Sequence, residues 1–402
     1  MMQKIRVNHL IETLSFGGAE RRLIADVLGM DRTRFTHEVC YLFGCGEQRQ
    51  ALEQAGVRVT GLNLASPYAV PAAIGRVTRW LKASRPDLLH TQVFWADQVG
   101  RIAARLVGVP VVTTLQLASY EPDVPDVYSR KRRWVDRQLG RRGTAAFIAV
   151  SEWVRQSTIR RLGYAPETIH VIPNHIQLER FANGGAQEAQ RVGDEIRYRM
   201  GAATNPLVVV VARIVPSKGH AYLLEAIARL RPRWPGLRVA VLGQSSPWKA
   251  WVDRRAAALG IESCVSFLGI QPEIEAWLAA ADLFVLPTLC EGLPVSLLEA
   301  MAAGCACVST RIPPVQEIIE HGATGWLCEP ADSDSLAAAM NDLLVDASLR
   351  ERLGRAAREA VKRFDSAQHV ARLEQLYLSL VPRTPHGAPA AEAPAELSAS
   401  PA

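Results

Sequence analysis

The feature that most constrains the fold of this chain is a regular alternation of short apolar runs with longer segments of helical period. The runs are rich in Val, Ile and Leu; examples are KIRVNHLI and VPVVTTL in the first half and PLVVVVA and DLFVLP in the second. Buried strands that alternate with helices form parallel sheets covered by helices on both faces. The predicted class is therefore α/β, with helices expected over 19–30, 71–83, 96–106 and 152–162.

Length and a break in this pattern indicate two such domains. A chain of 402 residues is too long for one ordinary core, since about 150 residues per domain is typical. The segment 182–195 is polar and rich in glycine, and a new apolar run begins at Leu207. We therefore expect one doubly wound domain over 1–183 and a second over 184–365. Ligands of such sheets bind beyond the carboxyl ends of the strands, so the natural site is the cleft between the domains.

The ends of the chain and its cysteines bear on where the protein works. A last helix is expected over 366–382, crossing back to the first domain, and the Pro- and Ala-rich segment 383–402 is expected to be a disordered tail. No uncharged apolar run approaches the ~18 residues of a membrane-spanning helix, and the first residues read as strand and loop rather than as a signal peptide. With seven scattered cysteines expected as reduced thiols, these features predict a cytoplasmic protein.

Charge is divided unequally between the two halves. Residues 1–199 hold 28 Lys and Arg against 19 Asp and Glu, whereas residues 200–402 hold 18 against 21. A basic half favours an anionic partner, which could be nucleic acid, anionic lipid or a phosphorylated substrate. No nucleic-acid motif accompanies the basic residues, so we expect no nucleic-acid partner.

The basic residues concentrate in VYSRKRRWVDRQLGRR, residues 127–142, which contains seven Lys and Arg and one Asp. On a helix this segment has a basic face and a short apolar stripe that includes Trp134, a pattern suited to lying on an anionic membrane surface. The alternative is a solvated helix that packs Trp134 into the core of the first domain. We expect peripheral membrane contact here.

Two loops that follow predicted strands carry groups suited to a phosphorylated ligand. In LSFGGAER, Gly17 and Gly18 end a loop and open a helix, whose unpaired N–H groups can bind phosphate. A plain tight turn explains these glycines equally well. In VARIVPSKG, Arg213 and Lys218 could clamp a diphosphate, Arg by its fork and Lys as a point charge. A solvated charged loop is the alternative.

A third loop carries two carboxylates. Glu291 ends the loop of EGLPVSLLEAMAAG, and Glu299 follows eight positions later on a predicted helix. The two could form a hydrolytic pair, or they could accept hydrogen bonds from sugar hydroxyls at two points of one ligand. Alternatively they are a helix-start acid and a surface acid. Glu299 lies in the apolar stretch LLEAM, where a charge needs a partner.

Together these loops resemble glycosyltransferase family 4, whose members have the GT-B fold of two doubly wound, Rossmann-like domains facing a central cleft. The resemblance extends to about residue 380. It is carried by FGGAER, ARIVPSKG, FLG at 267–269 and the block ADLFVLPTLCEGLPVSLLEAMAAGCACVSTRIPPVQEIIEHGATGWLCEPAD. In that block Glu291 and Glu299 stand at the spacing of the family's two glutamates.

The resemblance implies a retaining transfer of a sugar from a UDP- or GDP-sugar to a glycan or lipid-linked acceptor, in surface polysaccharide or glycolipid biosynthesis. Arg213 and Lys218 would hold the donor diphosphate, Glu299 the ribose hydroxyls and Glu291 the donor sugar. Backbone and pocket contacts to the donor would come from Gly17, Gly18, Leu268, Gly269, Gly292 and Leu293. No metal or other cofactor is implied, because the two cations neutralise the departing diphosphate.

Some residues depart from the family pattern or leave a choice open. Gln116 stands where many members carry a histidine in the acceptor-side wall, and His90 is either an acceptor contact or a satisfied loop histidine. Asp332 begins an Asp-x-Asp sequence but is expected to cap a helix rather than hold a metal. The alternatives to a retaining transferase are an epimerase or inverting transferase on the same fold, and a non-catalytic nucleotide-sugar-binding partner.

Overall fold

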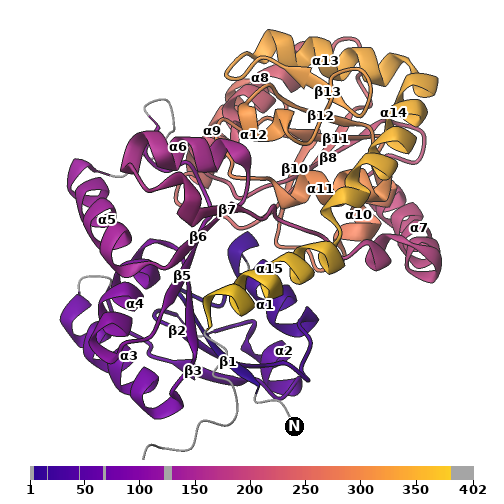
Figure 1. Cartoon of the computed structure of the whole chain (residues 1–402). Coiled ribbons are helices and arrows are strands. Elements are labelled where there is room, and N and C mark those ends of the chain that lie inside the picture. The colour runs from indigo at the N-terminus through magenta and orange to yellow at the C-terminus, as the bar shows by residue number, and fades with distance from the viewer. Residues whose placement is uncertain (1–3, 16, 45, 67–68, 122–128, 382–402) are drawn as a thin grey trace, which may run out of the picture.

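In the computed structural model the chain forms two α/β domains, each built on one parallel sheet (Figure 1). The structure describes all residues except 1–3, 16, 45, 67–68, 122–128 and 382–402. The expected disordered tail, 383–402, therefore lies outside the described residues. The α/β class and the two doubly wound, Rossmann-like sheets predicted from the sequence are confirmed.

The first sheet has seven strands in the order β3-β2-β1-β4-β5-β6-β7. Its strands are β1 (Ile5–Ile11), β2 (Phe35–Tyr41), β3 (Arg58–Gly61), β4 (Leu88–Gln92), β5 (Val111–Leu115), β6 (Ala146–Ala149) and β7 (Ile169–Val171). The helices of this half are α1 (Gly18–Gly29), α2 (Arg49–Gln54), α3 (Val70–Ser84), α4 (Phe94–Val107), α5 (Arg130–Gly143) and α6 (Glu152–Leu162). Strand order reverses between β1 and β4, and this switch point opens the crevice where ligands bind in such sheets.

The second sheet has six strands in the order β10-β9-β8-β11-β12-β13. Its strands are β8 (Leu207–Val211), β9 (Arg238–Leu242), β10 (Val265–Gly269), β11 (Leu283–Leu286), β12 (Cys307–Thr310) and β13 (Trp326–Cys328). The helices are α8 (His220–Leu230), α9 (Lys249–Ala258), α10 (Ile274–Ala280), α11 (Val295–Ala303), α12 (Pro313–Gln316), α13 (Ser333–Val345) and α14 (Ala347–Ala360). Every residue of β8 is buried, as a central strand with helices on both faces requires.

The polar, glycine-rich segment 182–195, which marked the break between the domains, forms most of helix α7 (Asn183–Arg199), and this helix packs on α10. Apart from its glycines the segment consists largely of good helix formers. Arg191 also pairs with Glu188 at 2.6 Å and with Glu195 at 2.7 Å, at the spacings of neighbours on a helix surface.

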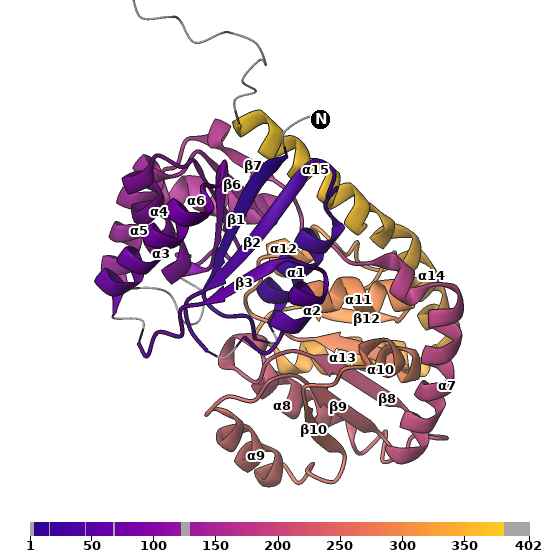
Figure 2. The same ribbon diagram turned by 90° about the horizontal axis from the view of Figure 1, so that it is seen from below.

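Helix α15 (Ser366–Leu380) follows α14 and the 3-10 turn η4 (Val361–Phe364) and lies against the first domain. Figure 2 shows it running from the second domain to the region of the N-terminus. Its buried side chains Val370, Leu373, Leu376 and Tyr377 share one core cluster with residues of β1, β2 and β4. The first and last described elements, β1 and α15, therefore belong to the same domain.

The two domains also touch directly. The Glu317 carboxylate of the second domain accepts hydrogen bonds from the backbone N–H groups of Glu152 at 2.9 Å and Trp153 at 2.8 Å, at the start of α6. A carboxylate at a helix N-terminus is stabilised by the unpaired N–H groups and the helix dipole. One apolar cluster joins Val150 and Val154 of the first domain to Leu293 and Val315 of the second.

Within the described residues, no helix combines the length and the apolar character that crossing a membrane requires. Asp332 caps α13 as predicted, since its carboxylate accepts the N–H groups of Asp334 and Ser335, each at 2.9 Å.

Candidate active site

A cavity of about 950 Å³ lies between the two domains, at the carboxyl ends of both sheets. Loops that follow β1, β4, β5, β8, β9, β10 and β11 contribute to its lining. Most residues selected from the sequence meet here. Those that line the cavity are Gly17, Gly18, Gln116, Arg213, Lys218, Glu291, Gly292 and Leu293.

Lys218 and Glu291 form an ion pair in the second-domain wall. The Lys218 Nζ atom lies 2.5 Å from Glu291 Oε1 and donates to the Cys290 carbonyl at 3.4 Å. Lys218 ends the 3-10 turn η3 (Pro216–Lys218), and Gly219 follows with a φ of +70°. A Cβ on Gly219 would lie 1.7 Å from the Pro287 carbonyl oxygen, so only glycine lets this loop pass so close to the end of β11.

Arg213 lies in the same loop, exposed on the cavity wall. Its backbone carbonyl accepts a hydrogen bond from His220 Nε2 at 2.9 Å. This bond holds the backbone of the loop, and Arg213 lines the cavity. With Lys218 it provides two cations at the end of β8, where a diphosphate would need them.

Gly17 and Gly18 face these cations from the first domain. Helix α1 begins at Gly18, and its N-cap residue Gly17 has no side chain that could cap the first turn. A Cβ on Gly18 would meet nothing within 4 Å, so the space beside Gly18 is open, whereas a Cβ on Gly17 would meet the Glu20 carboxylate at 2.0 Å. Unpaired N–H groups at such an end bind anions.

The loop between β11 and α11 meets the acceptor-side wall at Gly292. A Cβ on Gly292 would lie 1.9 Å from the Gln116 carbonyl oxygen, so the two domains touch backbone to backbone at this point. The Gln116 side chain donates to Gln92 Oε1 at 3.2 Å, and the Leu293 carbonyl accepts from Asn174 Nδ2 at 2.8 Å.

Glu299 is not part of the cavity lining. Only 3 % of its surface is exposed, on α11, and its Oε1 atom lies 3.5 Å from Arg21 and 3.9 Å from Arg180. Its Oε2 atom has no hydrogen-bond partner among the described residues. Burial raises the pKa of this carboxyl, an effect that the two guanidinium groups oppose.

Both arginines beside Glu299 line the cavity, and the sequence analysis missed them. Arg21 could have been noticed because it lies on the first turn of the helix that Gly17 and Gly18 open. Arg180, in the 3-10 turn η2 (Leu178–Phe181), carries no such local signal.

Leu268 and Gly269 lie just outside the cavity lining. Gly269 ends β10, and the residues after it, Ile270 to Pro272, line the cavity instead. The backbone of the predicted pair is tied down: Leu268 O accepts from Gln271 Nε2 at 2.7 Å, and Gly269 O from the Gly243 N–H at 2.8 Å. The part of this loop that lines the cavity therefore begins one residue after the predicted pair.

His90 is not an acceptor-side residue in this structure. It lies within β4 rather than after it and is fully buried. Its Nδ1 and Nε2 atoms lie 2.7 Å from Tyr377 Oη and 2.7 Å from Thr114 Oγ1. Burial lowers its pKa to about 3, so the ring is neutral at neutral pH. Its partner Tyr377 belongs to α15; the sequence predicts that this helix crosses back to the first domain, but it does not indicate that Tyr377 contacts His90.

Among the described residues, one group of three could offer ligand atoms to a metal: Asp26, His175 and His369. It lies outside the cavity lining. Arg22 Nε stands 3.7 Å from Asp26 Oδ2, so a positive charge already neutralises this carboxylate.

Two Rossmann-like domains that face each other across a cleft define the GT-B class. A solved structure of Anabaena Alr3699/HepE with UDP and glucose superimposes with a TM-score of 0.82 at 24 % identity, covering 93 % of this chain and 100 % of that one. A sucrose-phosphate synthase from Thermosynechococcus elongatus superimposes with a TM-score of 0.80 at 18 % identity, covering 93 % and 99 %.

Sequence comparison identifies the family. Residues 17–175 match the glycosyl transferase 4-like domain, and residues 194–360 match glycosyl transferases group 1. An Escherichia coli UDP-Gal:alpha-D-GlcNAc-diphosphoundecaprenol alpha-1,3-galactosyltransferase is 28 % identical over 305 residues, 75 % of this chain and 77 % of that one. A Corynebacterium glutamicum D-inositol 3-phosphate glycosyltransferase is 28 % identical over 304 residues, 72 % of each. The chain belongs to the GT-B glycosyltransferases with a family 4-like first domain and a group 1 second domain.

Proposed function

We propose that this glycosyltransferase moves a sugar from a UDP- or GDP-sugar to a glycan or lipid-linked acceptor, with retention at the anomeric carbon. The observation that carries the proposal is the 2.5 Å pair of Lys218 and Glu291 in one cavity with Arg213 and the open start of α1. In this arrangement Arg213, Lys218 and the Gly18 N–H hold the diphosphate, and Glu291 contacts the donor sugar. Two relatives with related chemistry act on a UDP-sugar and on an inositol phosphate, according to their names.

The proposed chemistry is stabilisation of a leaving group. As the bond from the sugar to the phosphate breaks, negative charge develops on the diphosphate, and preorganised cations and N–H groups stabilise it. The same two cations are the basis for proposing that no metal is required. Glu299 would reach the ribose only if Arg21 and Arg180 turned away from it. Otherwise these two arginines would bind the nucleotide in place of Glu299.

Retention is proposed because the cavity offers no suitable base on the acceptor side. No histidine lines the described part of the cavity, and Glu291 is tied to Lys218. Asp136 is bound by Arg101 and Tyr120, and Asp97 is buried. A departing phosphate oxygen, on the same face as the leaving group, is then the base for the acceptor hydroxyl.

The test is donor binding followed by donor hydrolysis without acceptor. A thermal-shift screen with UDP-glucose, UDP-galactose and GDP-mannose is expected to raise the Tm with at least one of them, because a ligand that binds only the folded state stabilises it. Release of the nucleoside diphosphate is expected to fall about 100-fold or more in Lys218→Ala. Addition of EDTA is expected to leave it unchanged.

Lys362→Ala, an exposed position in η4, serves as the control and keeps wild-type turnover. Binding without hydrolysis or transfer would favour the non-catalytic partner, and a product of opposite anomeric configuration would favour an inverting enzyme. No Tm shift with any donor would contradict the donor assignment. We also propose that the enzyme works at the cytoplasmic face of a membrane, where a lipid-linked acceptor would be met.

A further inference from the structure

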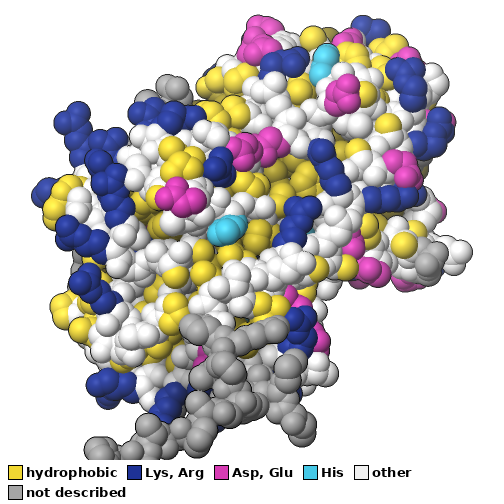
Figure 3. Space-filling model, in the orientation of Figure 1, with side chains coloured by type: hydrophobic (Ala, Val, Ile, Leu, Met, Phe, Trp, Pro, Cys, Tyr) yellow, Lys and Arg dark blue, Asp and Glu magenta, His cyan; other side chains and the backbone are white. Residues whose placement is uncertain are grey.

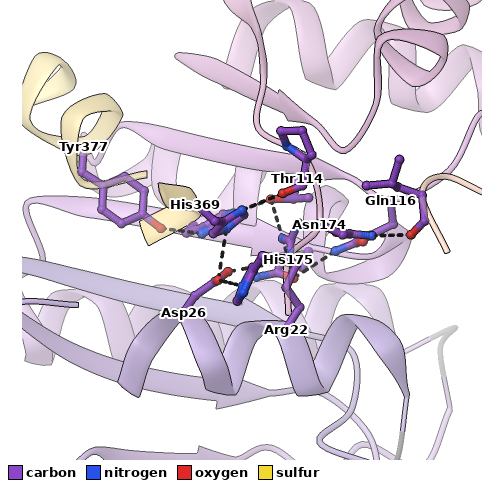
Figure 4. A network of polar contacts seen from close by, with 12 residues as sticks. Arg22, Asp26, Thr114, Gln116, Asn174, His175, His369 and Tyr377 are labelled. Carbon is purple, nitrogen blue, oxygen red and sulfur yellow. Dashed lines mark hydrogen bonds and ion pairs between the residues drawn. The ribbon is translucent and has the colours of Figure 1, made fainter. Parts of the chain in front are cut away.

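Arg22, on α1, is a guanidinium buried behind the cleft wall, and it joins three separate segments. It donates to Asn174 Oδ1 at 3.3 Å, to Gln92 Oε1 at 3.3 Å and to Thr114 Oγ1 at 3.0 Å (Figure 4). These partners stand on the segment after β7, at the end of β4 and near the end of β5. The Arg22 guanidinium therefore fixes three side chains that lie 70 to 152 residues away from it in the sequence.

Two of these contacts continue to the cavity. Asn174 receives the bond from Arg22 on its Oδ1 atom and donates from Nδ2 to the Leu293 carbonyl at 2.8 Å. Gln92 Oε1 accepts from Arg22 and also from Gln116 Nε2 at 3.2 Å. Leu293 belongs to the loop beside Glu291, and Gln116 belongs to the facing wall. Two successive hydrogen bonds therefore connect Arg22 to each side of the cleft.

A second set of contacts fixes the charge of Arg22. Its Nε atom lies 3.7 Å from Asp26 Oδ2, while Asp26 Oδ1 lies 2.7 Å from His175 Nε2 and 3.1 Å from His369 Nε2 (Figure 4). Burial works against an ionised Asp26, but His369 and His175 hold its pKa well below the usual range. A buried ion pair of this kind adds little to stability compared with apolar packing, so its value lies in fixed geometry.

We propose that Arg22 is a positioning residue for the transfer reaction, which sets the donor-sugar loop at Leu293 against the acceptor wall at Gln116 through Asn174 and Gln92. The inference rests on the proposed function, since it assigns Arg22 a part in placing the groups of that site. Arg22 is not among the described residues that line the cavity. It acts through Asn174, whose two ends face the first domain and the second.

Two substitutions test the coupling. Arg22→Lys keeps a charge for Asp26, but one ammonium cannot reach Asn174, Gln92 and Thr114 together. Asn174→Asp keeps the acceptor for Arg22 and the volume, but it removes the donor to Leu293. The assay is hydrolysis of UDP-glucose or UDP-galactose, whichever the wild type turns over faster. Each single variant is expected to lower kcat about 10- to 100-fold, because small misplacements of the reacting groups have effects of this size. KM should stay within about twofold, because the diphosphate contacts remain.

The double variant distinguishes a relay from two separate structural losses. The double variant is expected to lose less kcat than the product of the two single losses, because both variants break the connection through Asn174 and only Arg22→Lys also breaks the one through Gln92. Arg197→Lys is the matched control: Arg197 also joins three groups, the Ala280 carbonyl, Asp282 and the Asn205 carbonyl, but it does not line the cleft. It is expected to lower the Tm and leave kcat unchanged.

Multiplied losses in the double variant, or single variants that lower only the Tm, would overturn the inference and leave the proposed function intact. If Arg22→Lys does not fold, the Asn174→Asp variant alone tests the inference. An unchanged kcat in Asn174→Asp would show that the hydrogen bond from Asn174 to the Leu293 loop does not position the site. A wild type that hydrolyses no nucleotide sugar would overturn the proposed function and, with it, this inference.

Discussion

At the scale of single residues, the cleft depends on positions where a side chain would not fit. Gly219 and Gly292 each bring the second domain's loops against a carbonyl oxygen, that of Pro287 and that of Gln116. Gly292 matters more for function because its contact crosses from one domain to the other. The glycine therefore allows the donor-sugar loop and the acceptor wall to meet.

Replacing Gly292 tests this contact. In Gly292→Ala the new Cβ would lie 1.9 Å from Gln116 O and 2.9 Å from Val150 Cγ2, so the domains must separate at this point. We expect a Tm lower by several degrees and donor hydrolysis reduced about 10-fold or more, measured by thermal unfolding and nucleotide release.

Gly75→Ala is the control for that substitution. Gly75 lies exposed inside α3, and a Cβ there meets nothing within 4 Å. Alanine is expected to stabilise this helix by about 0.5–1 kcal/mol. Wild-type stability and hydrolysis in Gly292→Ala would show that the loop is not held against the wall.

At the scale of elements, α5 stands out by its surface. Trp134 is 64 % exposed and does not enter the core, which removes the alternative explanation of this basic segment. Exposed cations surround it on the helix: Arg130, Lys131, Arg133, Arg137, Arg141 and Arg142. Figure 3 shows dark blue side chains gathered at the left edge of the molecule, over this helix. Residues 127 and 128 of the predicted segment lie outside the described residues.

We expect α5 to bind anionic membranes. Flotation with vesicles of phosphatidylglycerol and phosphatidylcholine at low salt should recover the wild type, and an increase in salt should release it, because the attraction is electrostatic. Trp134→Ala combined with Arg133→Gln and Arg137→Gln is expected to lose most of this binding. Trp251→Ala, a partly exposed tryptophan on α9, should float like the wild type. No flotation of the wild type would contradict a membrane role for α5.

At the scale of the whole molecule, stability depends on buried and half-buried histidines in the first domain. Burial is the largest cause that lowers the pKa of His37 to about 4 and that of His90 to about 3, and it also lowers the pKa of His9 and His175. These rings are neutral in the folded protein. The unfolded chain takes up protons near pH 6.5, so below that pH it binds more protons than the folded chain does.

The expected result is a stability that rises with pH from about 4 to about 6.5 and then levels off, with each such histidine contributing up to about 1.4 kcal/mol per pH unit. Thermal unfolding between pH 8 and pH 5 measures this slope. His37→Gln removes one of the groups and should flatten the slope, whereas His170→Gln, at an exposed position, should not. An equal Tm at pH 7 and pH 5 would contradict the prediction.

The sequence by itself determined the order of strands and helices and the loops that carry the chemistry. Both follow from local patterns. The spacing of apolar residues determines which segments form strands and helices, and a parallel sheet brings the carboxyl ends of all its strands to one edge. For this reason Gly18, Arg213, Lys218 and Glu291 could be assigned to one cleft. The helix in the polar segment 182–195 was missed because its glycines masked a helix-forming composition.

Only the tertiary structure decided which distant residues meet. The arginines beside Glu299, the burial of His90 under α15 and the contacts of Arg22 all join residues separated by many tens of positions. The local spacing of apolar residues and the composition do not indicate such pairs, because each partner taken alone is an ordinary charged or polar residue. Packing the two domains and α15 together placed each of them, and with them the geometry of the cleft.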